Sequence, residues 1–220
     1  MPFDTLRVVG GGASRALLTL VGADGTQNHP HATALCSRAA PMRDVCDAVH
    51  VACMLHGRHP GIIDHASAHT HLPGAQDWLS QAAEAFALER QYLASLTAAA
   101  GPLPSTPGQA ESEAAVTAQR HALDMLAQSD RVGCAFGAAV ALALDWTVIR
   151  AVLDGAANRL GLYPASLALP AARETASVID TVAAGPATER AMQFGVQQLL
   201  AQQRGLWDLL EARASARENG

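Results

Sequence analysis

Hydrophobic residues recur every three or four positions along most of the chain, the spacing that places side chains on one face of an α-helix. The clearest case lies between about residues 75 and 99, where the apolar positions are Leu79, Ala82, Phe86, Leu93 and Leu96. The same spacing, with glycine and proline at the breaks, predicts further helices over about 14–21, 32–38, 41–56, 107–128, 171–184 and 186–217. The chain is therefore expected to be all-α.

The segment from about 131 to 160 has a different pattern, because its first half is apolar nearly all round. A helix without a polar face is typically surrounded by other helices. Its apolar run, 132–144, is far shorter than the roughly 20 residues that a membrane-spanning helix needs. Gly133 and Gly137 would let a neighbouring backbone come close. We expect a single helical bundle of about six to seven helices with this helix at its centre, forming one domain over residues 1–220.

Three connecting segments carry further predictions. Residues 1–12 end in three consecutive glycines and are expected to be a flexible or irregular lead. Residues 56–74 are rich in glycine, proline and histidine, which predicts turns with at most one helical turn. Thr106, Pro107 and Gln109 follow the pattern T-P-x-Q, which predicts a capping box at the start of the next helix.

The last predicted helix carries a heptad-like seam with steps of four, three, four, three and four residues. Its positions are Met192, Val196, Leu199, Gln203, Leu206 and Leu210. Such a seam packs either within the bundle or against a second subunit. A homo-oligomer through the C-terminal helix is therefore one of two alternatives.

Composition and charge exclude several classes of function. The formal net charge is −5, and the fifteen basic residues, all arginine, are scattered along the chain, so nucleic acid is not an expected partner. A chain without lysine forms no lysine Schiff base and carries no GK[ST] phosphate loop. The four cysteines lack the spacing of a secreted disulfide scaffold, and the start lacks a signal peptide. We expect a cytoplasmic protein that is neither exported nor in a membrane.

Two carboxylates fall on apolar stripes and are expected to point into the bundle: Glu89 and Asp145. Burying an unpaired carboxylate costs several kcal/mol, so each needs a cation, a metal ion or a proton. His121 lies on a neighbouring helix, and His50 belongs to a D-x-x-H pair on another. Carboxylates and histidine from adjacent helices are a known way to hold a transition metal such as Fe, Mn or Zn inside a bundle.

An alternative needs no metal, since arginine side chains close to the stripes would neutralise the two carboxylates. The candidate partners are Arg90, Arg120, Arg150 and His121. Buried charges are usually paired in this way, and the pairs would fix how the helices dock. The chain also has no E-x-x-H sequence, which counts against a ferritin-like di-iron site.

Two other groups of metal-ligating residues are present. Eight of the nine histidines lie between His29 and His71, and His65 and His69 are four residues apart. In a segment rich in turns such histidines are more often solvated side chains or helix caps than ligands. Cys46, His50 and Cys53 are spaced four and three on one predicted helix, where cysteines are usually small core residues.

Three stretches resemble signatures of a bacterial all-helical protein family of unknown function. They are HGRHPGIIDH, GPLPSTPGQAE and QRHALDMLAQSDR. The resemblance covers the middle of the chain and implies no activity. The layout of helices is also similar to ferritin-like and haem-oxygenase-like bundles, and similarity of architecture does not carry function.

The buried polar residues support two hypotheses about function. In the first, inward Glu89, His121 and Asp145, helped by His50, bind a transition metal for redox chemistry or storage. In the second, the chain is a non-catalytic ligand-binding or protein-interaction module in which the same carboxylates form structural salt bridges. A small-molecule ligand, haem included, between the helices is compatible with the second hypothesis.

Overall fold

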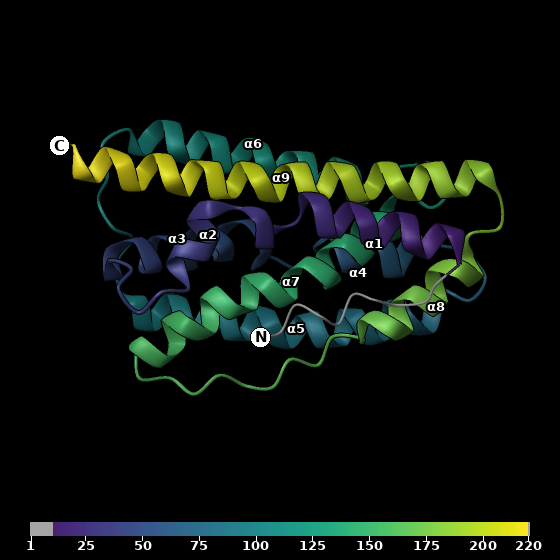
Figure 1. Ribbon diagram of the computed structural model, residues 1–220, viewed down its shortest axis with the longest axis horizontal. Coiled ribbons are helices and arrows are strands. Elements are labelled where there is room, and N and C mark those ends of the chain that lie inside the picture. Colours follow the sequence, from purple (N-terminus) through teal and green to yellow (C-terminus); the bar gives the residue numbers. More distant parts are fainter. Residues whose placement is uncertain (1–10, 220) are drawn as a thin grey trace.

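The computed structural model describes residues 11–219, and this range is helical throughout apart from connecting turns and loops (Figure 1). Its elements are α1 (Gly12–Asp24), the 3₁₀ turn η2 (Thr26–Asn28), α2 (Pro30–Leu35), α3 (Met42–His56), α4 (Ile62–His69), α5 (Gln76–Ala100), α6 (Gln109–Ala127), α7 (Cys134–Arg159), α8 (Ala172–Val182) and α9 (Pro186–Glu218). The predicted all-α class is confirmed. Most of the predicted lead over 1–12 lies outside the described residues, and Gly12 already begins α1.

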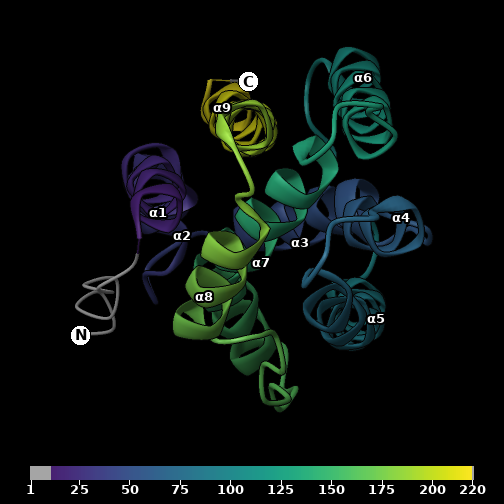
Figure 2. The ribbon, with the colours of Figure 1, turned by 90° about the vertical axis from the view of Figure 1, so that its right-hand side faces the viewer.

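Helix α7 is the centre of the fold, as its pattern predicts. In the end-on view of Figure 2 it lies between α9 and α1 on one side and α4 and α5 on the other. The helix is long and apolar enough to cross a membrane, but 78% of its most apolar window is buried inside the fold. Burial of this extent matches the core helix of a soluble bundle.

Helix α9 packs more extensively on α7 than any other pair of helices does, and glycine permits the contact. A Cβ atom added at Gly137 of α7 would lie 2.2 Å from the carbonyl oxygen of Met192 in α9. A Cβ added at Gly195 of α9 would lie 2.1 Å from the carbonyl oxygen of Cys134 in α7. The predicted close approach at Gly137 is confirmed, and its partner is α9.

Helix α9 also provides a spine for the molecule, running along one long edge beside α6 (Figure 1). All six positions of its heptad-like seam are buried within the chain, including Gln203. The seam therefore packs inside the bundle, which is the first of the two alternatives that its spacing left open. A homo-oligomer through α9 would have to use another face of the helix.

Two local predictions were wrong. Residues 62–69 form an eight-residue helix, α4, because Ile62, Ile63 and Ala66 bury one face and the Asp64 carboxylate accepts the Gly61 N–H at its start (2.7 Å). The capping box expected at Thr106 does not form, because α6 begins after Gly108, which adopts the left-handed conformation (φ 74°).

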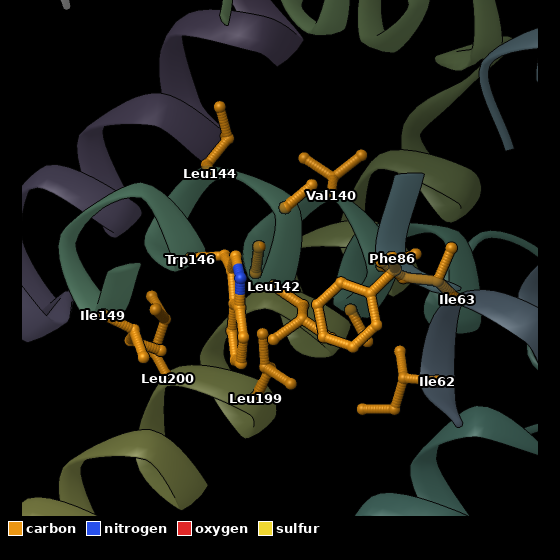
Figure 3. Close-up of a cluster of buried hydrophobic side chains, with 14 of the residues drawn as sticks. Ile62, Ile63, Phe86, Val140, Leu142, Leu144, Trp146, Ile149, Leu199 and Leu200 are labelled. Carbon is orange, nitrogen blue, oxygen red and sulfur yellow. The ribbon is translucent and has the colours of Figure 1, made fainter. Parts of the chain in front are cut away.

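Aromatic side chains occupy the middle of the core. The Trp146 ring of α7 packs edge-on against Phe86 of α5, with ring centroids 4.8 Å apart. Figure 3 shows these two rings with Leu142 beside them and with Ile62 and Ile63 of α4 closing the cluster. The helices α4, α5 and α7 therefore pack together around Trp146.

Candidate functional site

Glu89 is buried on α5, as predicted, and both of its carboxylate oxygens are occupied. Arg150 of α7 donates to one oxygen (2.6 Å) and the indole N–H of Trp146 donates to the other (2.8 Å). Arg150 also binds Asp154 (2.7 Å) and lies over the Tyr92 ring, 4.1 Å from its centroid. This cluster joins α5 to α7, which is the structural salt bridge that the second hypothesis expects.

Asp145 is also buried, but no arginine reaches it in the part of the chain that the structure describes. Its oxygens accept the main-chain N–H (2.7 Å) and the hydroxyl (2.6 Å) of Thr26, whose oxygen accepts the Trp207 indole N–H (2.9 Å). Burial raises the pKa of the Asp145 carboxyl, against these hydrogen bonds. A Cβ at Gly25 would lie 2.9 Å from the carboxylate and 2.4 Å from the Val21 carbonyl oxygen, so glycine permits the contact.

The other two predicted ligands lie apart from these carboxylates. His121 is exposed on α6, whereas His50 of α3 is half-buried with an Nε2 atom that has no hydrogen-bond partner. Within residues 11–219 the four side chains do not form a group close enough to share one ion. The expectation that Glu89, His121, Asp145 and His50 converge is therefore corrected, because Glu89 and Asp145 are held by different partners on different helices.

A second buried network joins α3 to α9. Arg213 donates to both oxygens of Asp47 (2.8 and 2.9 Å), and Arg217 bridges Asp44 (2.8 Å) and Asp47 (2.7 Å). Arg217 also donates to the Thr106 hydroxyl (2.7 Å), which explains why Thr106 does not cap α6. Two cations thus face two anions, so the network is balanced and structural.

One of several hollows among the described residues is a cavity of about 170 Å³ where the end of α3, the start of α4 and the second half of α6 meet. Two segments far apart in sequence, 55–65 and 120–128, supply most of its lining. Its apolar wall consists of Leu55, Ile62, Phe86, Leu123 and Leu142. Figure 3 shows the Phe86, Leu142 and Ile62 part of this wall.

The charged groups of the cavity are unbalanced. Arg58, which is exposed, and Arg120, which is half-buried, line it, and neither guanidinium has an ion-pair or hydrogen-bond partner among the described residues. By contrast Arg90, close by, is held by both oxygens of Asp64 (2.9 and 3.0 Å). With Asp124 as the one acidic lining residue, two arginines and one aspartate leave a net positive charge, which favours an anion.

One buried histidine, His56, completes the lining. Burial lowers its pKa to about 4, so the ring is neutral near pH 7. Its Nε2 lies 3.1 Å from Oε1 of Gln203, and with the carboxamide in this orientation Nε2 carries the proton, because a carboxamide oxygen only accepts. The other nitrogen, Nδ1, then has a free lone pair that can accept a hydrogen bond from a ligand.

Residues 21–218 match the sequence model of DUF6975, a protein family of unknown function. The chain belongs to DUF6975. The resemblance inferred from the three sequence stretches is confirmed as membership of a helical family of unknown function, and a bacterial origin stays a prediction. No curated protein matches the chain, and no solved structure does, so the similarity to ferritin-like or haem-oxygenase-like bundles also stays a prediction.

Two of those three stretches form the cavity of this DUF6975 chain. HGRHPGIIDH contributes Arg58 and three histidines, and QRHALDMLAQSDR contributes Arg120 and Asp124. From the sequence, Arg120 is expected only as a partner for a buried carboxylate, and no pattern marks Arg58. The spacing of residues along the chain could not show that Arg58 and Arg120 line the same cavity. Their proximity depends on α4, which brings the first stretch toward α6.

The histidines between His29 and His71 do not act as one cluster in this DUF6975 fold. His56, His59 and His65 line the cavity, while His69 and His71 line a neighbouring hollow that shares His65 with it. His29 lies elsewhere, at the start of α2. Cys46 is buried and Cys53 half-buried, both with free thiols, consistent with their interpretation as core residues.

Proposed function

We propose that this DUF6975 protein binds a small organic anion in the cavity between α3, α4 and α6, as a ligand-binding module. The observation that carries the proposal is the pair of unpartnered guanidinium groups, Arg58 and Arg120, beside an apolar wall. Guanidinium groups hold carboxylates or phosphates through charge-assisted hydrogen bonds. The apolar wall would take the hydrocarbon part of the same molecule.

The size of the cavity restricts the ligand. Pockets for drug-sized molecules enclose roughly 300–1,000 Å³. The volume here is about 170 Å³, which suits a compact molecule with one anionic group. Nδ1 of His56 would accept a hydrogen bond from a hydroxyl or N–H on that ligand, since its lone pair is free at neutral pH.

Binding rather than catalysis is what these groups supply best. A general base is most effective when its pKa lies near the working pH, and a pKa of about 4 makes His56 a weak base there. Arginine keeps its proton at all ordinary pH values, so Arg58 and Arg120 stabilise charge and do not transfer protons.

The remaining expectations about cell biology are part of the same proposal. The four free cysteines support a reducing compartment, and we propose the cytoplasm. The net charge of −5 and the local character of the positive site favour a small anion over nucleic acid as the partner.

Thermal unfolding and calorimetry with three probes of similar shape test the proposal. Benzoate and phenyl phosphate carry a carboxylate and a phosphate, and benzyl alcohol is their neutral counterpart. We expect one or both anions to bind and to raise Tm, whereas the alcohol does not, and the comparison of the two anions identifies the preferred group.

Variants of the two arginines localise the binding. Arg58→Gln and Arg120→Gln each remove a charge-assisted hydrogen bond of roughly 1.5–3 kcal/mol, so Kd should rise about tenfold or more. Arg204→Gln, an exposed arginine paired with Asp24 away from the cavity, is the matched control and should bind as wild type. Equal affinity in Arg120→Gln and wild type, or no binding of either anion, would contradict the proposal.

A further inference from the structure

A second group of polar side chains lies outside the cavity, where the start of α2 meets α9. His29, Asp208 and Glu211 each offer one ligand atom, and these three atoms lie within 4.8 Å of one another. Asp208 and Glu211 are three residues apart on α9, so they share one face of the helix. None of the three lines the anion cavity.

We propose that His29, Asp208 and Glu211 bind one divalent transition-metal ion, of which Zn²⁺ is the representative. One imidazole and two carboxylates without a thiolate suit Zn²⁺ and other borderline divalent ions. The proposal is independent of anion binding. It replaces the ligand set that the sequence predicted with residues that meet in space.

The spacing of the atoms fits a shared ion. Ligand atoms about 2.1 Å from a tetrahedral Zn²⁺ ion lie about 3.4 Å apart. Nε2 of His29 and Oδ1 of Asp208 are separated by 3.1 Å. The Glu211 ligand atom lies within 4.8 Å of both, so rotation of its exposed side chain would bring the three ligand atoms onto one ion.

The charges also favour a cation. Asp24 on the rim of the same hollow is neutralised by Arg204 at 2.9 Å. Asp208 has only His29 as a partner, and Glu211 has no ion pair within residues 11–219. Two carboxylates on adjacent turns of one helix repel each other, and a divalent ion between them removes that repulsion.

Buried hydrogen bonds fix the positions of the ligands. Trp207 precedes Asp208 on α9, and its indole N–H binds Thr26, three residues before His29. Thr26 is held in turn by the buried carboxylate of Asp145. The segment that carries His29 is thereby attached to α7 through Asp145 and to α9 through Trp207. Hydrogen bonds of this kind commonly orient the ligands of metal sites.

Metal binding would change the protonation of one ring nitrogen. Nδ1 of His29 accepts the main-chain N–H of His31 (3.2 Å), so the neutral ring carries its proton on Nε2 and donates it to Asp208. A metal ion binds through the lone pair of Nε2, so Nε2 must first lose its proton. The proton then moves to Nδ1. The ion and the N-terminal cap of α2 therefore compete, which gives a local readout at His31.

The test uses the untagged full-length chain, titrated with Zn²⁺ by calorimetry and with Co²⁺ by visible absorbance. We expect one ion per chain at the site. Asp208→Asn and Glu211→Gln should each weaken binding at least tenfold. Both residues are exposed, so the variants should fold normally. Glu218→Gln, exposed on the same helix, is the control for loss of one negative charge.

A competing pair of histidines needs its own control. His65 and His69 lie four residues apart on α4, with ring centroids 6.0 Å apart, and such pairs can hold transition metals. His69→Ala should retain the site, and the His31 amide should exchange faster with solvent when Zn²⁺ is bound. Unchanged affinity in Asp208→Asn and Glu211→Gln, or loss of the ion in His69→Ala alone, would overturn the proposal.

Discussion

At the scale of single residues, the most informative group is a histidine kept neutral inside the core. His56 packs edge-on against Trp146, with ring centroids 5.4 Å apart, and its only hydrogen bond in the described structure is to Gln203. No carboxylate compensates the imidazolium charge, so burial lowers the pKa to about 4. Protonation of this ring is then linked directly to the stability of the fold.

Acid should therefore destabilise the protein through His56. In the unfolded chain the imidazole has a pKa of about 6.5, so between pH 6.5 and 4 the unfolded state binds more protons than the native state. The contribution of His56 to the free energy of unfolding should fall by about 2 kcal/mol between about pH 7 and pH 5. Urea unfolding at both pH values measures this loss.

The variant His56→Leu separates this effect from other titrations. Leucine lowers stability at every pH because Gln203 loses its partner, but the fall between pH 7 and pH 5 should shrink by about the same 2 kcal/mol. His121→Ala, at an exposed position, should keep the wild-type pH dependence. An identical pH dependence in His56→Leu and wild type would show that the buried ring does not titrate as described.

Residues also mark the limit of what the sequence could predict about the site. The stripes correctly placed Glu89 and Asp145 inside the bundle, and Arg150 was among the partners expected for Glu89. The partner of Asp145 was not foreseen, because Thr26 lies 119 residues away in a turn. Helical spacing gives the direction of a side chain within its own helix and carries no information about which distant turn it meets.

At the scale of elements, the crossing of α7 and α9 depends on glycine at the contact. Gly137 and Gly195 each face the backbone of the other helix at distances where no Cβ fits. The sequence predicted that a backbone would approach α7 near Gly137 but not that α9 would supply it. Helix α4 was missed for the opposite reason, since its eight residues are too few for a periodic pattern to stand out among glycines and histidines.

Two glycines on the same helix should respond in opposite ways to alanine. Gly137→Ala would force the crossing apart and lower the free energy of unfolding by about 2 kcal/mol or more. Gly155 lies within α7 with open space around its Cβ position, so Gly155→Ala should raise stability by roughly 0.5–1 kcal/mol through helix propensity. Thermal or urea unfolding compares them, and equal effects would mean that the crossing is not tight.

At the scale of the whole molecule, α9 links most of the other helices. Its first half packs on α7, and its second half is joined to α3 by the Arg213 and Arg217 ion pairs and to α6 by packing. The same helix carries Gln203, which holds His56 beside the anion cavity, and the two carboxylates of the proposed metal site. Both candidate sites therefore depend on α9 being in place.

Because the seam of α9 packs inside one chain, truncating a seam residue should lower the stability of the fold. The molar mass of the protein in solution should stay unchanged. Leu199 is fully buried, and Leu199→Ala should lower the free energy of unfolding by about 2–5 kcal/mol. Phe194 on the same helix is 39% exposed, so Phe194→Ala should change stability by about 1 kcal/mol or less. Light scattering on native protein compares the molar masses. A dimer in wild type that dissociates specifically in Leu199→Ala would show that the seam joins two subunits, and the arrangement of α9 around α7 would then have to be revised.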